Sequence, residues 1–478
     1  MTYEEAREFI DSSNQYGSKL GLEVITELLK RLDNPQDHLK VIHVAGTNGK
    51  GSTAAFLSTI LAEEGYLVGR YISPAVFTYR ERVQISRHTR KDNTATGPIC
   101  IADEIREDLG RIVNMAVSKN QEYMDRNLES DSTSDSIITD YITERGVAAA
   151  VERIQPICEA MARDGYSHPT SFEIETAMAF LYMVCEQVDF AVIEVGMGGR
   201  LDATNVIRKP VCSVITSVSM DHMQFLGDTL EQIAGEKAGI IKKASPAVTG
   251  NRNSQVCRVL ERVCDELDSK LITITEEAKE IRYSPYETSF TYQNQRYTIG
   301  LLGEYQIDNA ILAIQTAKVL RALGYGIKDS SIVYGLNKTR WKGRFELLAK
   351  NPYFIIDGAH NEAAAYELEK SIKRYFPNRK LIFILGVLAD KDYHKILKIT
   401  APYAKIILTV RPQNSRSLDS HLLAKEAEKY TDGEVIDTVT VSKALKTAYE
   451  KADQEDVILA FGSLSYLGEL CKHLTELR

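Results

Sequence analysis

The chain contains 478 residues, of which 44% are hydrophobic and 26% charged, as in globular proteins that bury a full core. Its 58 Lys and Arg against 66 Asp and Glu give a formal charge of −8, which excludes the basic surface of a protein that coats nucleic acid. No apolar stretch approaches the roughly 18 residues of a membrane span, and the acidic N-terminus does not resemble a signal peptide.

The cysteine pattern also bears on the class of protein. The chain has seven cysteines, an odd number, with no Cys-x-x-Cys pair and no short spacing that suits zinc. Most lie in apolar runs, so they are expected to be buried thiols in a reducing compartment. Together these properties predict a cytoplasmic enzyme or binding protein of two or three domains.

The N-terminal segment predicts helices followed by a βαβ unit. Thr2-x-x-Glu5 is a capping box, and leucines and isoleucines over 22–32 repeat at helical spacing. Residues 40–44 form a β-branched run that ends abruptly at a glycine turn. A helix is expected over 52–64 and a second strand over 67–72, which completes the unit.

The following region interrupts this alternation. We interpret residues 87–167 as a surface insertion, because 118–145 is polar and rich in Ser and Asp. The alternation then resumes with two continuous apolar runs typical of buried parallel strands, a helix and a hairpin, predicted over 190–195, 211–216, 230–242 and 290–301 respectively.

A basic segment, 337–346, has few structure signals and is the candidate linker. Beyond it, strands alternate with amphipathic helices, the strands being predicted over 354–356, 381–385, 405–410 and 457–461. The predicted fold is therefore α/β. It has an N-terminal domain with a mostly parallel sheet (1–336), the linker, and a smaller C-terminal Rossmann-like domain (347–478).

The segment Gly46-Thr-Asn-Gly-Lys-Gly-Ser52 carries the clearest chemical signal. It departs from the strict P-loop pattern, because position 44 is Val and position 51 is Gly. Three glycines nevertheless allow backbone N–H groups to face phosphate oxygens, and a helix follows at once. Lys50 could reach the β- and γ-phosphates. The alternative is an ordinary glycine turn with a solvated lysine, but the flanking strand and helix favour phosphate binding.

Four further motifs lie at predicted strand or helix ends. Glu194–Asn205 is glycine-rich after a buried strand, where ligands of α/β sheets gather. Asp221-His222, with Lys237 further on, could be metal ligands, a base or a surface histidine. Glu173 is either a Mg²⁺ ligand or an ordinary acid at a helix start. Asp357–Asn361 ends a strand, although Asp-Gly alone usually marks a turn.

In combination, these motifs resemble the folylpolyglutamate synthase/dihydrofolate synthase family, within the Mur ligase superfamily. The resemblance runs in order over nearly the whole chain. It rests on Gly46–Ser52, Ser73-Pro74, Glu81-Arg82, Glu194–Asn205, Asp221-His222, Glu236–Ile240, Gly303–Gln306, Asn309, Gly343–Phe345, Asp357–Asn361, Leu388–Asp392 and Gly462-Ser463. The Gly-Lys-Gly-Ser ending of the first loop fits this branch better than the Gly-Lys-Thr-Thr typical of peptidoglycan ligases.

The resemblance implies an ATP- and Mg²⁺-dependent acid–amino-acid ligase, with an N-terminal P-loop-type ATPase domain. In that family a substrate carboxylate attacks the γ-phosphate of ATP, and L-glutamate then displaces the acyl phosphate. The substrates would be reduced folate or dihydropteroate. The expected ATP contacts are Gly46, Thr47, Asn48, Gly49, Lys50, Gly51, Ser52, Asn309, Arg344 and Asp357.

The resemblance also implies two Mg²⁺ ions. Ser52, Ser73 and Glu173 match ligands of the first ion, and His222 matches a ligand of the second. Lys237 matches the lysine that the superfamily carboxylates with CO₂, because a carbamate is an anionic oxygen ligand whereas an ammonium is not. The competing interpretation is an ion pair with Glu236.

The expected catalytic residues are Lys50, Lys237, His222, Arg344, Asp357 and His360. His360 and Ser463 match positions near the incoming glutamate, whereas Arg82 and the stretch 18–21 match pterin-contacting positions. We expect small-molecule partners only, without nucleic acid or membrane, and a monomer.

The sequence departs from the family after Ser73-Pro74, where Ala75-Val76 replaces a pair that is often His-Leu. The preference between dihydropteroate and reduced folate is therefore open, and 87–167 is longer than expected. A rival is a Mur-type ligase acting on a UDP-linked peptide, which would usually need another N-terminal domain, whereas only about forty residues precede the first loop. Another rival is a catalytically idle nucleotide-binding module, against which the joint presence of Lys50, Glu173, His222, Lys237 and Arg344 argues.

Overall fold

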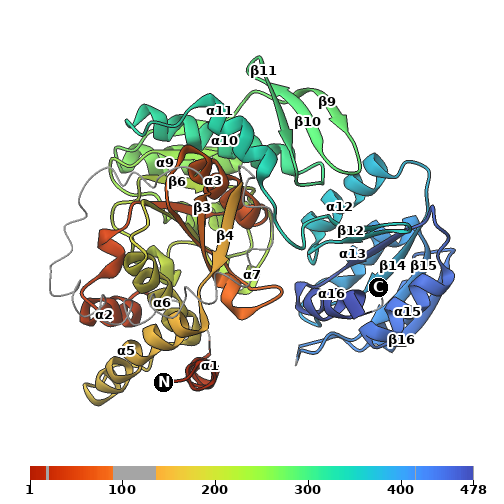
Figure 1. The fold of residues 1–478 in the computed structure, drawn as a ribbon, viewed down its shortest axis with the longest axis horizontal. Coiled ribbons are helices and arrows are strands. Elements are labelled where there is room, and N and C mark those ends of the chain that lie inside the picture. The colour runs from red at the N-terminus through yellow and green to blue at the C-terminus, as the bar shows by residue number, and fades with distance from the viewer. Residues whose placement is uncertain (18–20, 90–135, 415, 477–478) are drawn as a thin grey trace.

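A computed structural model describes residues 1–17, 21–89, 136–414 and 416–476. These residues form two α/β bodies with a small third sheet between them (Figure 1). The predicted α/β fold with a mostly parallel first sheet and a separate C-terminal sheet is confirmed. Within the described ranges, no helix is both long and apolar enough to cross a membrane.

The first sheet has eight strands in the order β4-β3-β2-β5-β1-β6-β7-β8. All neighbours from β2 to β8 pair in parallel, whereas β3 and β4 are antiparallel. The strands are β1 (Val41–Ala45), β2 (Val68–Tyr71), β3 (Val83–His88), β4 (Ile137–Tyr141), β5 (Phe190–Glu194), β6 (Cys212–Ile215), β7 (Ala247–Thr249) and β8 (Leu271–Thr273).

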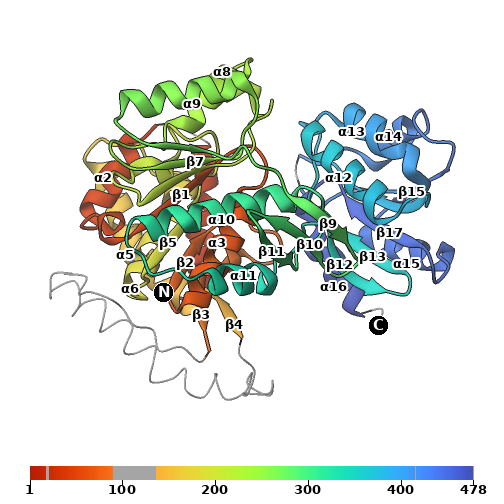
Figure 2. The same ribbon diagram turned by 90° about the horizontal axis from the view of Figure 1, so that it is seen from above.

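Helices cover both faces of this sheet, as expected when βαβ crossovers bury parallel strands (Figure 2). The helices of the first body are α1 (Tyr3–Ser12), α2 (Glu23–Arg31), α3 (Lys50–Glu64), α5 (Glu144–Arg163), α6 (Ser171–Cys185), α7 (Met223–Leu226), α8 (Leu230–Ala238), α9 (Ser254–Glu266), α10 (Gln306–Ala322) and α11 (Asp329–Lys338). The predicted capping box is present, because the hydroxyl of Thr2 accepts from the backbone of Glu5 and the reverse bond also forms.

The prediction of a surface insertion over 87–167 is wrong for its second half. Strand β4 pairs with β3, and α5 buries an apolar face that includes Val147, Val151 and Ile154. The polar stretch over 118–145 extends into the start of this helix, so its apolar period emerges only further along the chain. Residues 90–135 of the proposed insertion lie outside the described residues.

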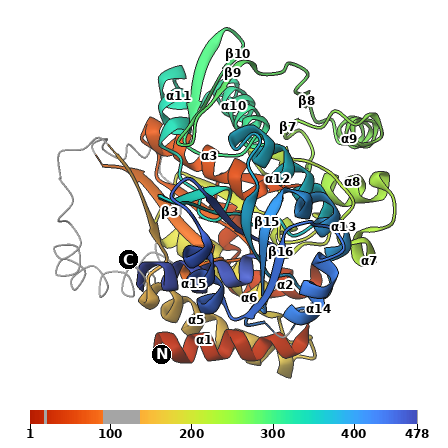
Figure 3. The same ribbon diagram turned by 90° about the vertical axis from the view of Figure 1, so that its right-hand side faces the viewer.

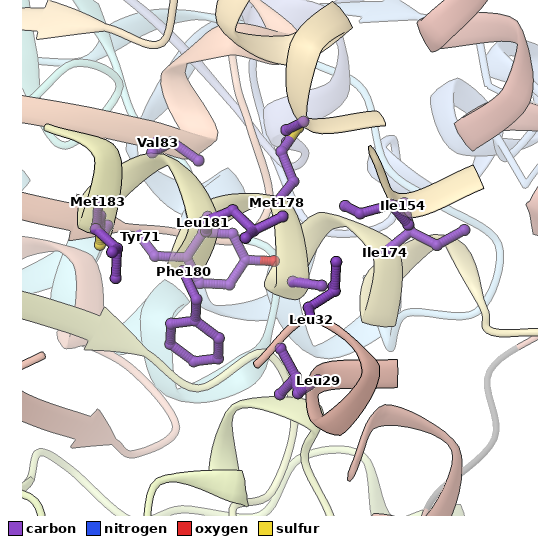
Figure 4. Packing of buried hydrophobic residues seen from close by; sticks show 14 of the residues in the cluster. Leu29, Leu32, Tyr71, Val83, Ile154, Ile174, Met178, Phe180, Leu181 and Met183 are labelled. Carbon is purple, nitrogen blue, oxygen red and sulfur yellow. The ribbon is translucent and has the colours of Figure 1, made fainter. Parts of the chain in front are cut away.

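The larger core of the first body lies beneath α2, α5 and α6. Figure 4 shows Leu29 of α2 and Leu32, which caps that helix, beside Ile154 of α5 and several side chains of α6. Each such fully buried side chain contributes about 1.5–3 kcal/mol. This core anchors the strands whose carboxyl ends carry the polar motifs.

The hairpin predicted around Gln293-Asn294 is confirmed. Strands β10 (Thr288–Tyr292) and β11 (Gln295–Ile299) pair across these two residues, and both have positive φ, as a two-residue hairpin turn requires. Strand β9 (Lys279–Tyr283) completes a three-stranded antiparallel sheet.

The C-terminal body has a six-stranded sheet in the order β12-β13-β17-β14-β15-β16, parallel except for β12. Figure 3 views the molecule from this side. The strands are β12 (Glu346–Lys350), β13 (Tyr353–Ile356), β14 (Leu381–Leu385), β15 (Ala404–Val410), β16 (Glu434–Val439) and β17 (Val457–Phe461). The helices are α12 (Glu362–Tyr375), α13 (Tyr393–Thr400), α14 (Ser420–Ala427), α15 (Val441–Lys451) and α16 (Leu467–Glu476). Residues 339–345 connect α11 to β12.

Candidate active site

The glycine turn after β1 leads directly into α3, whose first residue is Lys50. Gly46 has φ of 152°, and a Cβ there would lie 1.7 Å from the hydroxyl of Thr216. Gly49 has φ of 86°, and a Cβ there would lie 2.3 Å from Oδ1 of Asn309. Both positions therefore require glycine, and the turn brings the N-terminus of α3 to the carboxyl edge of the sheet.

Lys50 folds back over this turn. Its Nζ donates to the carbonyl oxygens of Gly46 and Thr47, each at 3.1 Å. Thr47 is held in turn by the end of β6, because its N–H donates to the carbonyl of Ser217 at 2.6 Å. The positive charge of the lysine thus lies over the loop, where phosphate oxygens would be received.

The start of α10 packs against the start of α3. Ser52 is only 2% exposed, and its hydroxyl accepts a hydrogen bond from Nε2 of Gln306 at 3.2 Å. Asn309 donates to Oε1 of Gln306 at 3.0 Å. The predicted positions Ser52 and Asn309 therefore belong to one polar cluster around the loop.

Glu194 ends β5 next to the loop, since it pairs in register with Val44 of β1. Burial raises the pKa of its carboxyl group to about 7, although the charges of Lys50, Arg344 and Arg70 and the backbone N–H of Ser73 act in the opposite direction. A buried carboxylate surrounded by three cations is a candidate ligand of a hard metal ion.

Glu173, which the sequence assigned to the metal, is placed elsewhere. It is the third residue of α6, and Oε2 accepts from the N–H and the hydroxyl of Thr170, both at 2.8 Å. Its charge acts on Cys158 of the neighbouring α5. The assignment of Glu173 to Mg²⁺ stays a prediction: its carboxylate caps its own helix, whereas Glu194 lies beside the loop.

Lys237 is the penultimate residue of α8 and lies near Lys50 of the loop. It is 3% exposed, and burial, with the nearby charge of Lys50, lowers the pKa of its amino group to about 7, although Asp221 acts in the opposite direction. The competing ion pair is not formed, because Glu236 contacts Arg200 at 2.6 Å. Lys237 is thus a buried amine that readily loses its proton.

Asp221 and His222 lie between this lysine and the second body. His222 caps α7 with positive φ, and burial lowers the pKa of its imidazole, opposed by Asp221. Asp221 accepts from Nδ2 of Asn361 at 3.0 Å, and Nζ of Lys391 lies 3.9 Å from its Oδ1. Asn361 also contacts Oδ1 of Asn48 in the glycine turn at 3.4 Å. The two bodies therefore meet directly at the loop.

The carboxyl end of β13 contributes Asp357. Its Oδ2 accepts from the hydroxyl of Tyr305 at 3.1 Å and from the N–H of Phe345 at 2.8 Å, and its Oδ1 accepts from the N–H of Ala359 at 2.8 Å. The guanidinium of Arg344 lies near enough to act on the pKa of both Asp357 and Glu194. The connecting segment thus places a cation between the two bodies.

His360 follows in the same loop. Its Nδ1 lies 2.7 Å from the carbonyl oxygen of Gly358, and we assign the proton to Nδ1 because a carbonyl can only accept. Burial lowers the pKa of this imidazole to about 4, so the ring is neutral at neutral pH.

The predicted substrate residues lie further apart. Ser463 follows β17 in the second body, where its hydroxyl accepts from the N–H of Ser465 at 3.2 Å. Arg82 follows the loop after β2 and forms an ion pair with Glu175 of α6 at 3.1 Å. Residues 18–20 of the expected pterin-contacting stretch lie outside the described residues.

Sequence reasoning placed three residues in motifs without giving them a site role: Glu194 and Asn361, which lie beside the loop, and Lys391, which lies near Asp221. Glu194 could have been found from its place at the end of a strand next to β1. The contacts of Asn361 and Lys391 cross between bodies, so no local pattern indicates them.

Among the described residues, no three His, Cys, Asp or Glu side chains gather as a ready metal cage. The donor set beside the loop nevertheless suits Mg²⁺, because this ion keeps several waters and takes one or two protein ligands together with phosphate oxygens. The hydroxyl of Ser52 and the carboxylate of Glu194 are oxygen donors of this kind.

Comparison with known proteins agrees with this arrangement. Residues 132–317 match the Mur ligase middle domain, and residues 343–464 match the glutamate ligase domain of Mur ligases. A dihydrofolate synthase/folylpolyglutamate synthase of Bacillus subtilis is 31% identical, with 99% of each chain covered.

Solved structures are similar over the same length. The crystal structure of folylpolyglutamate synthase from Thermotoga maritima has a TM-score of 0.76 and 32% identity, covering 100% of this chain and 97% of that one. Folylpolyglutamate synthase of Mycobacterium tuberculosis, complexed with ADP and AMPPCP, has a TM-score of 0.79 and 27% identity, covering 98% and 97%. The chain therefore belongs to the folylpolyglutamate synthase/dihydrofolate synthase family of ATP-dependent amide ligases.

Proposed function

We propose that the protein joins L-glutamate to the carboxylate of a reduced folate or of dihydropteroate, with ATP as the phosphoryl donor. The observation that carries the proposal is the meeting of the phosphate loop with the second body, where Asn361 contacts both Asp221 and Asn48. The similar synthase of M. tuberculosis binds ADP and AMPPCP, which supports a nucleotide at this place.

The first step needs charge neutralisation, since a carboxylate must approach a triphosphate. Lys50 would leave the two carbonyls it now contacts and bind the β- and γ-phosphates, while the N-terminus of α3 faces the same oxygens. Arg344, in the connecting segment, would reach the phosphates from the side opposite to Lys50. The substrate carboxylate then attacks the γ-phosphorus, the bond to the β-phosphate oxygen breaks, and ADP and an acyl phosphate form.

Mg²⁺ would supply additional positive charge at the phosphates. We propose Ser52, Ser73 and Glu194 as the residues that hold the first ion, and His222 with the carboxylated Lys237 as those that hold the second. Ser73 is supported by its place beside Glu194, whose carboxylate accepts from the backbone N–H of Ser73.

The lowered pKa of the Lys237 amino group supports the formation of a carbamate on this lysine. Only a neutral amine attacks CO₂, and burial holds the pKa of the Lys237 amino group at about 7 instead of its ordinary 10.5. The product, a carbamate, replaces a cation near Lys50 by an anion. Its formation would therefore relieve the repulsion between these two lysines.

The second step takes place on the side of the C-terminal body. The α-amine of glutamate attacks the acyl carbon, phosphate leaves, and the nitrogen loses a proton. His360 suits this proton, because its ring is neutral and its Nδ1 is fixed by the carbonyl of Gly358, which leaves the lone pair on Nε2. Ser463, at the end of the adjacent β17, is proposed to contact the incoming glutamate.

The test is ADP and phosphate release by the purified protein with ATP, Mg²⁺ and glutamate. Tetrahydrofolate and dihydropteroate are added separately, and the glutamylated product is identified by mass spectrometry. We expect release that requires both glutamate and at least one pterin acid. Release that no pterin acid stimulates would contradict the proposal and favour a ligase for another carboxylate, whereas no release would favour an idle nucleotide-binding module.

Light scattering tests the expected monomer.

A further inference from the structure

Arg70, on β2, is a buried cation that the proposed reaction does not use. It is 4% exposed, and its Nη2 donates to Oε1 of Gln84. Burial lowers the pKa of the guanidinium to about 10, with Tyr141 and Glu194 acting in the opposite direction, so it remains charged at neutral pH. A buried permanent charge is costly unless neighbouring groups compensate for it.

One compensating group is the indole of Trp341, in the segment that connects the two bodies. Cζ of Arg70 lies 4.7 Å from the centre of this ring, which is a cation–π distance. The edge of the same ring approaches the phosphate loop. A Cβ on Gly51 would lie 3.0 Å from Cζ2 of Trp341 and 3.3 Å from Oε2 of Glu194. Indole, guanidinium and carboxylate therefore meet at the start of α3.

Two cations link the connecting segment to the carboxyl group of Glu194. Arg344, three residues after Trp341, lowers the pKa of the Glu194 carboxyl group, and so does Arg70, which Trp341 covers. We propose that Trp341 and Arg70 are positioning residues that hold the carboxylate of Glu194 against the phosphate loop. Through them, the carboxylate responds to the placement of the segment between the two bodies. This inference rests on the proposed function, in which Glu194 serves the metal and the nucleotide.

A second path from Arg70 reaches the same carboxylate. Gln84, which accepts from Arg70, donates to the carbonyl of Glu81 at 2.7 Å. The carboxylate of Glu81 accepts from the N–H groups of Val76 and Phe77, in the loop that begins with Ser73. These two residues pack against the apolar core of the second body, and the N–H of Ser73 donates to Glu194. The first path therefore connects Glu194 with the connecting segment, and the second connects it with the second body.

The experiment compares Trp341→Leu, which removes the aromatic face, with Trp341→Phe, which keeps one. We expect Trp341→Leu to raise the Mg²⁺ concentration for half-maximal velocity about tenfold, because a desolvated cation–π contact of this kind is worth about one factor of ten. The KM for the pterin acid should not change, and Trp341→Phe should stay within about threefold of wild type. Arg70→Gln should resemble Trp341→Leu, and the double variant should lose no more than either alone.

Tyr334→Leu is the matched control, because this exposed side chain on α11 is also aromatic and lies outside the polar cluster. A Mg²⁺ dependence in Trp341→Leu equal to that of wild type would overturn the proposal. So would equal losses in Trp341→Leu and Trp341→Phe that follow their losses of thermal stability.

Fluorescence gives a readout that does not depend on turnover, because Trp341 is the only tryptophan of the chain. We expect Arg70→Gln to change its emission in the free protein, and Mg²⁺ titrated in the presence of ADP to change it in wild type. Emission that responds to neither overturns the inference. If wild type shows no pterin-dependent ADP release, the proposed function fails, while the emission of Arg70→Gln still tests whether the pair exists.

Discussion

The two parallel sheets end in polar edges of different kinds. At the edge of the first sheet, Glu194 and Lys237 are buried, and burial displaces the pKa of each group to about 7. At the edge of the second sheet, Asp357 accepts hydrogen bonds from three donors, and His360 lies against the carbonyl of Gly358. Burial also raises the pKa of Asp357 and lowers that of His360 to about 4, so the edges differ less in burial than in hydrogen bonding, which fixes the groups of the second edge more fully.

This difference indicates a division of roles. Groups with displaced pKa values are stabilised most when a phosphate, a metal ion or CO₂ binds beside them. The first edge is therefore suited to binding charged ligands. Groups with fixed partners hold geometry, so the second edge is suited to orienting an uncharged amine and the ribose side of a nucleotide. Substitutions at the first edge should therefore affect catalysis more than stability.

The largest effect is expected for Lys50→Met. The variant loses the cation that faces the phosphates, and we expect kcat for ADP release to fall by about 10³-fold or more. Lys243→Met is the control, because Lys243 is exposed and lies away from the loop. An activity of Lys50→Met within tenfold of wild type would show that the first edge does not take part in the reaction.

A smaller but still large loss, about 10²-fold, is expected for Lys237→Ala, which cannot form a carbamate. Added short carboxylates should restore part of the activity without CO₂, since they can place an anionic oxygen in the vacated space. Lys242→Ala controls for removal of a neighbouring lysine, whose Nζ donates to the carbonyl of Gly239 at 3.2 Å. Full activity of Lys237→Ala would exclude the carbamate.

For Glu194→Gln we expect an activity loss of up to about 10²-fold together with a gain in stability at higher pH. The folded-state pKa of Glu194 is about 7 and its ordinary value 4.5, so wild-type stability should fall as pH rises through this window. Glutamine does not titrate. The melting temperature of the ligand-free variant should therefore exceed that of wild type by more at pH 8 than at pH 5. A melting-temperature difference that stays constant with pH would show that burial does not raise the pKa of Glu194 in the folded protein.

Local sequence patterns predicted the features that depend on neighbouring residues. The turn at Gly46–Gly49 follows from a buried strand, glycines and a helix in immediate succession, and the hairpin follows from Gln293-Asn294 between two alternating runs. Resemblance to the family then added Asp221, Lys237 and Asp357, whose roles no local pattern could have distinguished from those of ordinary turn residues.

The choice between Glu173 and Glu194 shows what local patterns cannot supply. Both are acids at the end of a secondary-structure element, and only the parallel pairing of β1 with β5 places Glu194 beside the loop. The bridge from Asn361 to Asp221 likewise joins residues 140 positions apart. The helix α5 was overlooked because a polar stretch precedes it, although its buried face repeats at helical spacing.

The smallest effect on activity is expected at Glu173, where it sharpens the contrast with Glu194. Glu173→Ala removes the carboxylate that accepts from the N–H and hydroxyl of Thr170, so we expect a loss of about 1 kcal/mol in stability. Thr170→Ala should cost a similar amount, and the double variant less than the sum, because both substitutions break one capping box. Activity and Mg²⁺ dependence should remain within about twofold of wild type, since a lost cap acts on the helix and not on the loop. If Glu173→Ala instead shifted the Mg²⁺ dependence as strongly as Glu194→Gln, the carboxylate of α6 and not that of β5 would bind the metal. The metal site at the first edge would then include Glu173 in place of Glu194.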